Sequence, residues 1–159
     1  MEVIEIIVET PKGSPFKYKY DQKKEWFVVH KMLPVGLVFP FDFGFIPGTK
    51  GEDGDPLDVL MLSEFSFIQG SMVKCNVIGS MKAAQTEENK TIRNDRIFAT
   101  PGIKGLYPDY ESLEDIQKKK MKEIESFFIY YNMMENKTFK PLGILSASET
   151  WKIIKKQRS

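Results

Sequence analysis

The sequence predicts an α+β fold made mainly of strands, in which helices pack against a small antiparallel barrel or strongly curved sheet. Two observations lead to this prediction. Strand-like patterns of β-branched and alternating aromatic residues fill the first hundred positions, and helical periodicity begins only beyond them. Strands that precede helices in this way are typical of α+β domains. The 159 residues contain no internal repeat and no Gly/Ser linker, so residues 1–159 are expected to form a single domain.

The strand patterns occupy the N-terminal two thirds of the chain. The predicted strands are residues 3–8, 16–20, 26–31, 73–78 and 96–100. In the second of these, alternation puts Lys17 and Lys19 on one face and aromatic side chains on the other. The third follows a short polar connection and is predicted to be its hairpin partner. The polar residues 82–94 are predicted to form an exposed hairpin loop.

The C-terminal third of the chain carries the helical signals. Apolar residues recur there mostly at spacings of three and four: Leu113, Ile116, Met121, Ile124, Phe127, Phe128 and Tyr131. This spacing predicts a long amphipathic helix, with Ser112 as its N-cap and Asp115 as a capping-box partner. A second, short helix is expected over residues 148–156, with Trp151 and Ile154 buried.

Charge and composition exclude a nucleic-acid binder. The chain has 23 Lys and Arg against 22 Asp and Glu, a formal net charge of +1 without the basic excess of such proteins. Lysine groups near residues 118–122 and 155–158 are therefore interpreted as solvated helix faces. The four alternating phenylalanines between residues 39 and 45 could stack on bases. Proline and glycine interrupt that segment, which favours core packing instead.

The expected compartment is the cytoplasm. The single cysteine, Cys75, cannot form an internal disulfide, and its apolar neighbours predict a buried thiol, as in a reducing compartment. Acidic residues interrupt the apolar N-terminus, which is read as neither a signal peptide nor an anchor. No apolar run in the sequence reaches the length that spans a membrane. A soluble protein without a membrane partner is expected.

The segment from Gly51 to Leu60 is the most informative for function. It places Asp53, Asp55 and Asp58 within six residues, around a glycine and a proline that favour a tight turn. Neighbouring carboxylates raise each other's pKa unless a cation neutralises them. Oxygen ligands without a cysteine cluster indicate Mg²⁺, Mn²⁺ or Ca²⁺ rather than zinc.

Two other interpretations of this segment were weighed. An EF-hand loop beginning at Asp53 is excluded, because Asp58 occupies the position that requires glycine. An Asp-Gly turn capped by its own side chains remains an alternative. It does not explain Asp58, which runs directly into the apolar residues 59–62.

Cations elsewhere in the chain suit a phosphate substrate. Mg²⁺ held by few carboxylates keeps open positions for phosphate oxygens. Lys17 and Lys19 share one strand face, and Arg96 opens another strand. Together with the aspartates, these residues suggest metal-assisted phosphoryl transfer to water.

The same residues resemble a known family, the soluble family I inorganic pyrophosphatases. The aspartate signature, residues 53–59, matches directly, and further matches follow in order along nearly the whole chain: residues 9–14, 17–18, 39–40, 43–47, 70–71, 127–128 and Tyr131. The resemblance implies an OB-like barrel with two helices. It also implies a cytoplasmic, usually oligomeric enzyme that uses Mg²⁺, with Mn²⁺ as an alternative, to split diphosphate into two phosphates.

The resemblance also implies roles for individual residues. Asp53 and Asp58 resemble metal ligands, and Asp55 resembles the residue that, with metal, deprotonates the attacking water. Glu9 resembles an outer carboxylate of the metal–substrate assembly. Three residues match phosphate-binding and catalytic positions: Lys17, Tyr131 and Arg96, the last of which stands where the family has a lysine.

Several site positions depart from the family pattern. Lys19 replaces a glutamate, His30 an arginine, Phe39 and Phe43 tyrosines, and Asn132 a lysine. Gln85 and Asn94 stand nearest to two lost aspartates, and Asp95 is one residue out of place. Fewer acids suggest fewer or weaker metals. Two alternatives therefore stay open: a same-fold hydrolase of another phosphate anhydride or ester, and a catalytically weakened binding protein.

Overall fold

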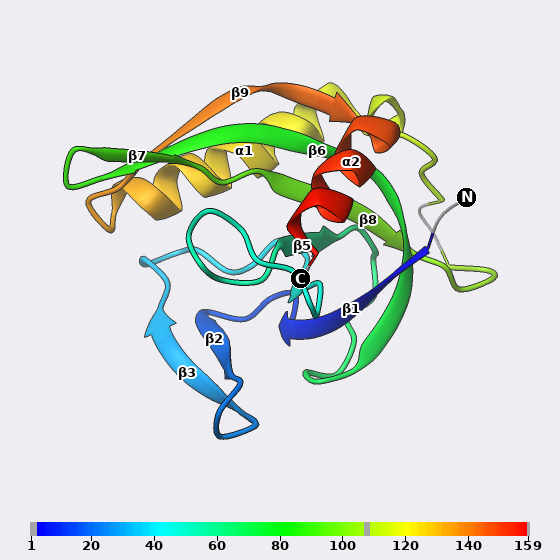
Figure 1. Ribbon diagram of the computed structural model, residues 1–159, viewed down its shortest axis with the longest axis horizontal. Coiled ribbons are helices and arrows are strands. Elements are labelled where there is room, and N and C mark those ends of the chain that lie inside the picture. The colour runs from blue at the N-terminus through cyan, green and yellow to red at the C-terminus, as the bar shows by residue number, and fades with distance from the viewer. Residues whose placement is uncertain (1–2, 107–108, 159) are drawn as a thin grey trace.

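The computed structural model describes residues 3–106 and 109–158, which form nine strands, one 3₁₀ turn and two α-helices (Figure 1). The strands are β1 (Val3–Thr10), β2 (Phe16–Asp21), β3 (Trp26–Met32), β4 (Asp42–Phe45), β5 (Asp58–Met61), β6 (Met72–Glu87), β7 (Lys90–Arg93), β8 (Arg96–Pro101) and β9 (Thr138–Ser146). The helices are η1 (Leu113–Asp115), α1 (Lys118–Met133) and α2 (Ala147–Gln157). The predicted α+β class, rich in strands, is confirmed.

The main sheet closes on itself into a barrel. Its strands follow the order β1-β4-β5-β8-β6-β7, and β1 also pairs with the first part of β6, which closes the ring. Strands β5 and β8 run parallel, whereas the other pairings within the described residues are antiparallel. The predicted antiparallel barrel is confirmed except for this one parallel pair among the described strands.

Strand β6 makes closure possible because it is long and bent. Its 16 residues pair with β1 at one end and with β7, β8 and β9 further along. The register with β8 shifts between Val77 and Gly79, and such bulges bend a strand sharply. Gly79 has φ +146°, and a Cβ there would lie 2.7 Å from the Leu145 carbonyl oxygen. Glycine is therefore required where β9 crosses the bend.

The predicted exposed loop over residues 82–94 is instead mostly strand. Strand β6 continues to Glu87, and β7 returns from Lys90 after a two-residue turn. Both turn residues, Glu88 and Asn89, have positive φ (50° and 63°), as tight hairpins require. The polar side chains that suggested a loop lie on an extended hairpin at the rim of the barrel. The sequence also gave no strand prediction for β4 or β9.

The long helix begins later than its periodicity predicts. Asp115 does accept a hydrogen bond from the Ser112 backbone N–H (3.0 Å), but this contact caps the short 3₁₀ turn η1. Ile116 is extended, and α1 starts at Lys118. The short C-terminal helix is confirmed; it begins at Ala147, because Ser146 and Glu149 form the capping box there (2.8 and 3.2 Å).

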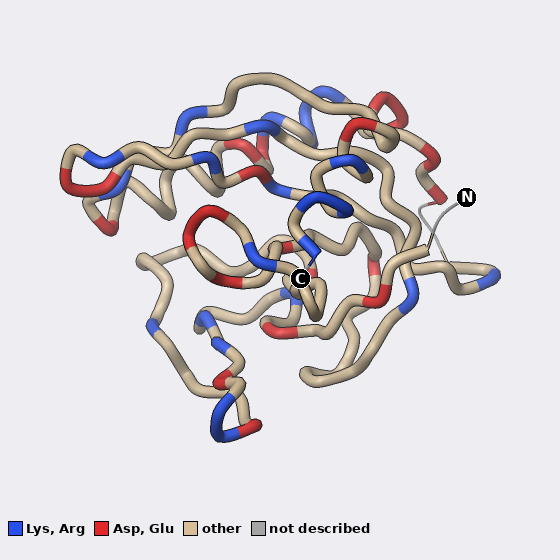
Figure 2. Tube along the Cα trace, viewed as in Figure 1, with Lys and Arg blue, Asp and Glu red and all other residues tan. Residues whose placement is uncertain are grey.

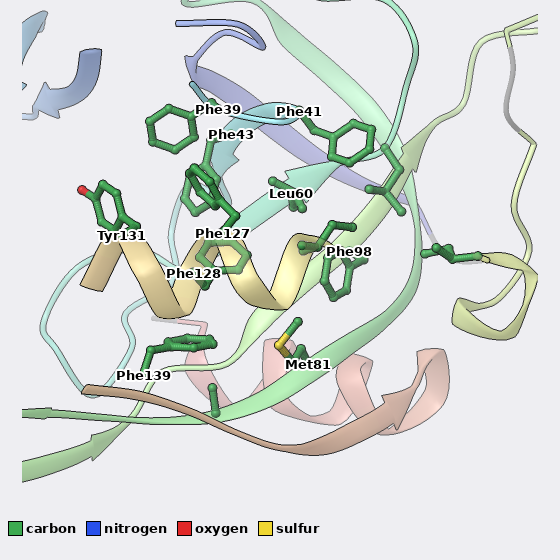
Figure 3. Packing of buried hydrophobic residues seen from close by; sticks show 14 of the residues in the cluster. Phe39, Phe41, Phe43, Leu60, Met81, Phe98, Phe127, Phe128, Tyr131 and Phe139 are labelled. Atoms are coloured by element: carbon green, nitrogen blue, oxygen red, sulfur yellow. The ribbon is translucent and has the colours of Figure 1, made fainter. Parts of the chain in front are cut away.

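The buried apolar residues form two clusters on either side of the barrel wall. The larger joins α1 to one face of the sheet (Figure 3), and its aromatic members are Phe39, Phe41, Phe43, Phe98, Phe127, Phe128, Tyr131 and Phe139. The smaller joins β1, β5, β6 and β8 to Ile154 of α2, with Trp151 partly buried beside it. The predicted core role of the phenylalanine segment is confirmed, since Phe45 is buried as well.

Two smaller predictions are also tested by the burial pattern. Cys75 is buried as expected, and burial raises the pKa of its thiol to about 12. Lys118, Lys119, Lys120 and Lys122 are exposed, which agrees with a solvated helix face. Among the residues that the structure describes, neither helix has the length and apolar character needed to cross a membrane.

Candidate active site

A cleft of about 400 Å³ opens at the rim of the barrel, between the β2–β3 hairpin, the loop before β5, the β6–β7 hairpin and the end of α1. All of the site residues expected from the sequence line it: Glu9, Lys17, Asp53, Asp55, Asp58, Arg96 and Tyr131. These residues come from five separate segments of the chain. The fold therefore brings together the acidic turn and the cations that the sequence could only list separately.

The aspartate turn forms one wall of the cleft. The Gly51 N–H donates to the Asp55 carbonyl (2.8 Å), the Asp55 N–H donates to Asp53 Oδ1 (3.0 Å), and Gly54 has φ +87°. Asp53 thus also performs the turn-capping role that was weighed as an alternative. Asp58 lies apart from the turn at the start of β5, where it pairs with Phe45. Burial raises the pKa of Asp58, and Asp53 and Asp55 raise it further.

The acids line one cleft without converging on one point. Within residues 3–106 and 109–158, no three Asp, Glu, His or Cys side chains lie close enough to enclose a metal ion. Asp55 instead forms an ion pair with Lys19, at 3.4 Å between Oδ2 and Nζ, with both side chains about half exposed. The donors are all carboxylate oxygens, which suits Mg²⁺, because this ion keeps several waters and needs few protein ligands.

Glu9 faces the cleft because of a bulge in β1. The register between β1 and β4 shifts between Val8 and Thr10, which leaves Glu9 as the extra residue. Its Oε2 accepts a hydrogen bond from the Tyr20 backbone N–H (3.0 Å). Burial raises the pKa of Glu9 to about 7, against that hydrogen bond, and the Asp58 carboxylate adds to the rise.

Two cations face the acids, the partly buried Lys17 and the buried Arg96. Burial lowers the pKa of Lys17, and the nearby Lys31 and Arg96 charges lower it further, whereas Asp58 opposes the change. The Arg96 guanidinium lies between two aromatic rings, 4.9 Å from Phe128 and 5.2 Å from Phe139. Arg96 is 7% exposed. Its Nη1 donates to the Asn94 carbonyl (3.2 Å), while its Nε has no hydrogen-bond partner in the part of the chain described.

Tyr131 lies in the C-terminal half of α1 (Figure 3) and lines the cleft. The Nζ atoms of Lys17 and Lys31 lie 5.9 and 5.5 Å from its ring centre. Its hydroxyl is buried and meets no hydrogen-bond acceptor or donor with good geometry among the described residues. Burial and the Glu135 carboxylate both raise the pKa of Tyr131, so the hydroxyl stays protonated and able to donate.

A family model described as inorganic pyrophosphatase matches residues 6–159 of this chain. The chain belongs to the inorganic pyrophosphatase family. The inorganic pyrophosphatase of Nanoarchaeum equitans is 39% identical over 159 residues, which cover 98% of this chain and 94% of that protein. The inorganic pyrophosphatase of Saccharolobus solfataricus is 35% identical over 156 residues, covering 96% and 88%. The resemblance seen in the sequence is confirmed.

Solved structures of the inorganic pyrophosphatase family share the fold. A crystal structure of an inorganic pyrophosphatase from Neisseria gonorrhoeae has a TM-score of 0.87 at 31% identity, over 98% of this chain and 88% of that chain. The inorganic pyrophosphatase of Thermus thermophilus has a TM-score of 0.88 at 27% identity, over 98% and 89%. The barrel with two helices is therefore the fold of this family.

The structure shows where the residues that depart from the inorganic pyrophosphatase pattern lie. Gln85 and Asn94, which stand for two lost aspartates, lie side by side in the cleft, and the Asn94 amide donates to Gln85 Oε1 (2.9 Å). Asp95 does not replace them. Its carboxylate accepts from Arg93 Nε (2.8 Å) and from the Ala83 N–H (3.0 Å), and it lines a neighbouring cavity.

The remaining departures divide between the cleft and the core. Lys19, His30 and Asn132 line the cleft. The Asn132 amide is buried and donates to the Phe128 carbonyl one turn earlier on α1 (2.7 Å), so it faces its own helix. Phe39 and Phe43, which stand where the family has tyrosines, pack in the core with ring centres 5.5 Å apart.

Sequence reasoning missed two cleft cations, Lys31 and Lys137. Lys31 follows His30 in β3, and in a strictly alternating strand the two side chains would lie on opposite faces. Lys137 immediately precedes β9, a strand that the sequence patterns do not predict. Its Nζ lies 3.6 Å from Glu87 on β6, another cleft residue that the sequence did not single out. Knowledge of the strand registers is needed to find either lysine.

Proposed function

We propose that this protein is an inorganic diphosphatase that uses Mg²⁺ to hydrolyse diphosphate to two phosphates. One observation carries the proposal: a single cleft places carboxylates opposite the buried Arg96 and the partly buried Lys17, neither of which has a carboxylate within ion-pair distance among the described residues. Buried charges without a partner are costly in the free protein. A bound polyanion would satisfy both.

Lys17, Arg96 and Tyr131 are the proposed substrate-binding groups. The unpaired Arg96 Nε and the Tyr131 hydroxyl are both donors, and phosphate oxygens accept such bonds strongly. The rings of Phe128 and Phe139 hold the guanidinium in one orientation. Less side-chain freedom is then lost when the substrate binds.

Asp53, Asp58, Asp55 and Glu9 are the residues that would hold Mg²⁺, with Mn²⁺ as an alternative hard cation. When bound, such an ion neutralises phosphate charge and makes water more acidic. Asp55 is the proposed base. Water oxygen forms a bond to one phosphorus, the bridging P–O bond breaks, and Asp55 accepts the proton that water loses. The Lys19 ammonium lies 3.4 Å from Asp55 Oδ2 and helps to position this carboxylate.

Phosphate release from diphosphate, measured with and without Mg²⁺ at neutral pH, tests this function. Asp55→Asn is expected to lower turnover by about 10²- to 10⁴-fold, the usual contribution of a positioned base, while diphosphate affinity changes little. Glu114→Gln, which removes an exposed carboxylate from η1, serves as the matched control and should retain wild-type turnover. Wild-type protein that releases no phosphate with Mg²⁺ would refute the proposal.

A second substrate class is favoured by the neutral part of the cleft. The amide pair Gln85–Asn94 replaces two acids on one wall, so a larger phosphate anhydride or an ester with fewer charges would meet less repulsion there. The same assay with triphosphate and with a phosphate monoester decides between them. Faster release from either than from diphosphate would favour this alternative, and tight binding without turnover would favour a binding protein.

Assembly and location complete the proposal. Exposed apolar side chains on β3, Val28, Val29 and Met32, support the expected homo-oligomer, because burying them between copies would remove apolar surface from water. Size-exclusion chromatography with light scattering measures the mass directly. A cytoplasmic location is supported by the single buried cysteine, Cys75, which needs no oxidising compartment.

A further inference from the structure

Thr49 is a buried residue in the β4–β5 loop, the segment 46–57 that carries Asp53 and Asp55 and leads directly into Asp58. The residue is 6% exposed. It is not among the residues that line the cleft, so any effect of its side chain on a bound ion must act through the loop.

The Thr49 hydroxyl joins the two ends of this loop. Its Oγ1 donates to the Ile46 carbonyl (2.6 Å) and accepts from the Leu57 N–H (2.9 Å). Beside it, the Ile46 N–H donates to the Leu57 carbonyl (3.0 Å). One hydroxyl and one backbone hydrogen bond therefore close the loop at its base, immediately before Asp58 begins β5.

Thr49 is itself held by the end of α2. Its backbone forms an antiparallel bridge with Arg158, and the Lys50 N–H donates to the Gln157 carbonyl (2.9 Å). Figure 2 shows the acidic loop before β5 next to the end of this helix. Because Ile154 of α2 is fully buried against the barrel, the loop is attached to a packed helix rather than to another loop.

This loop has to keep like charges near one another in the metal-free protein. The charges of Asp53 and Asp55 both act unfavourably on an ionised Asp58. Hydrogen bonds inside the turn, from the Gly51 N–H to the Asp55 carbonyl and from the Asp55 N–H to Asp53 Oδ1, set the shape of the turn itself. The Thr49 hydroxyl bonds to the residue before Asp58, so it resists the separation of turn and strand that charge repulsion favours.

We propose that Thr49 is a positioning residue for Mg²⁺ binding, whose hydroxyl holds the β4–β5 loop so that Asp53, Asp55 and Asp58 are in place before the ion arrives. This inference rests on the proposed function, in which these acids hold Mg²⁺. A loop that is already fixed in its bound conformation loses less freedom on binding, which strengthens affinity. Without the hydroxyl, the Leu57 N–H loses its partner, and Mg²⁺ binding has to supply the free energy that closes the loop.

The test measures how Mg²⁺ binding depends on this hydroxyl. Mg²⁺ affinity is measured by calorimetry without diphosphate, and the Mg²⁺ concentration at half-maximal turnover is measured with diphosphate. Thr49→Val replaces the hydroxyl by a methyl group and should weaken Mg²⁺ binding and raise that concentration by about 3- to 10-fold, the usual contribution of one hydrogen bond. Turnover at saturating Mg²⁺ should return close to the wild-type value, because the bound ion restores the loop. Thr49→Ser keeps the hydroxyl and should bind Mg²⁺ as wild type does.

Thr150 on α2 provides a matched control for lost stability. It too is buried, donates to the Ser146 carbonyl (2.8 Å) and shares a hydrogen bond with the Ser80 hydroxyl (2.8 Å). Thr150→Val should lower the melting temperature of the metal-free protein about as much as Thr49→Val does, but it should leave Mg²⁺ affinity at the wild-type value. A purely structural role of Thr49 predicts instead that the two variants bind Mg²⁺ equally well. If Thr49→Val does not fold, Thr49→Ala removes the hydroxyl without placing a methyl group against the Ile46 carbonyl.

The outcomes separate this inference from the function on which it rests. Wild-type protein that binds Mg²⁺ but does not hydrolyse diphosphate would refute the proposed function, and the calorimetric comparison of Thr49→Val with Thr150→Val would still decide the role of Thr49. Wild-type hydrolysis with equal Mg²⁺ affinity in those two variants would refute the role of Thr49 alone. Wild-type protein that binds no Mg²⁺, or a loss of turnover in Thr49→Val that saturating Mg²⁺ does not restore, would overturn the inference as well.

Discussion

Replacing Glu9 by glutamine should stabilise the metal-free protein at alkaline pH. The folded protein raises the pKa of Glu9 from 4.5 to about 7, chiefly through burial. A raised carboxyl pKa means that the folded state binds this proton more tightly than the unfolded state does. The wild type therefore loses stability as pH rises from about 4.5 through 7, and glutamine, which has no charge to bury, does not.

The size of the effect follows from the shift. At about 1.4 kcal/mol per pKa unit, ionising Glu9 in the fold costs about 3 kcal/mol at pH 8 but less than about 1 kcal/mol at pH 5. Remaining solvent contact screens part of this charge, so the expected gain at alkaline pH is about 2–3 kcal/mol. The glutamine oxygen can still accept the hydrogen bond from Tyr20, so little else is lost.

Urea unfolding in EDTA at about pH 5 and about pH 8 provides the assay. Glu9→Gln should match wild type near pH 5 and exceed it near pH 8. Glu5→Gln, an exposed acid on the same strand, controls for the loss of one carboxylate. A Glu9→Gln variant that is no more stable than wild type at pH 8, or equally stabilised at both pH values, would refute the argument. Mg²⁺ should reduce the advantage, because a bound cation stabilises the ionised carboxylate.

Three further predictions concern the proposed metal ligands and the barrel. Mg²⁺ at millimolar concentration should raise the melting temperature of wild type, because an ion that binds only the folded state stabilises it. Asp58→Asn should abolish that rise while leaving the metal-free protein folded. Scanning calorimetry measures both melting temperatures. The double variant Gln85→Asp, Asn94→Asp should lower the melting temperature of the metal-free protein, because the two new carboxylates would repel each other where the amides now form a hydrogen bond (2.9 Å). The same variant should enlarge the rise in melting temperature that Mg²⁺ causes. An unchanged rise would count against a metal role for this wall of the cleft. Gly44→Ala should lower the free energy of unfolding in urea by at least about 2 kcal/mol, since the new Cβ would lie 2.5 Å from the Ile7 carbonyl oxygen. A change within error of zero would contradict this packing.

Local patterns in the sequence were sufficient for the helices, most strands and the acidic turn. The buried face of an element is encoded within a few consecutive residues. Alternation with a period of two shows it at residues 16–20, and apolar spacings of three and four show it in α1. The Asp53–Asp58 signature is equally local, because its three aspartates lie within six consecutive residues of the sequence. The family assignment rested on such contiguous motifs, and the comparisons confirm it.

Non-local pairing decided what the sequence could not show. The second half of β6 is mostly polar, and β9 is interrupted by Pro141 and Gly143, so the strand character of both segments depends on their pairing with each other. The local capping contact at Ser112 was found in the sequence, but only packing shows that α1 begins five residues later than predicted.

In the candidate site, the sequence identified which residue types are present, but only the tertiary structure decided which way their side chains point. The sequence named Asp53, Lys17 and Arg96, whereas only the strand registers showed that Lys31 points into the cleft and Asp95 points away from it. A bulge inserts a single residue into one strand and thereby reverses which face the following side chains occupy. Bulges depend on the partner strand, so the chemistry of the acids could be read from the sequence, but the inward direction of Glu9 and Lys31 was decided by tertiary structure.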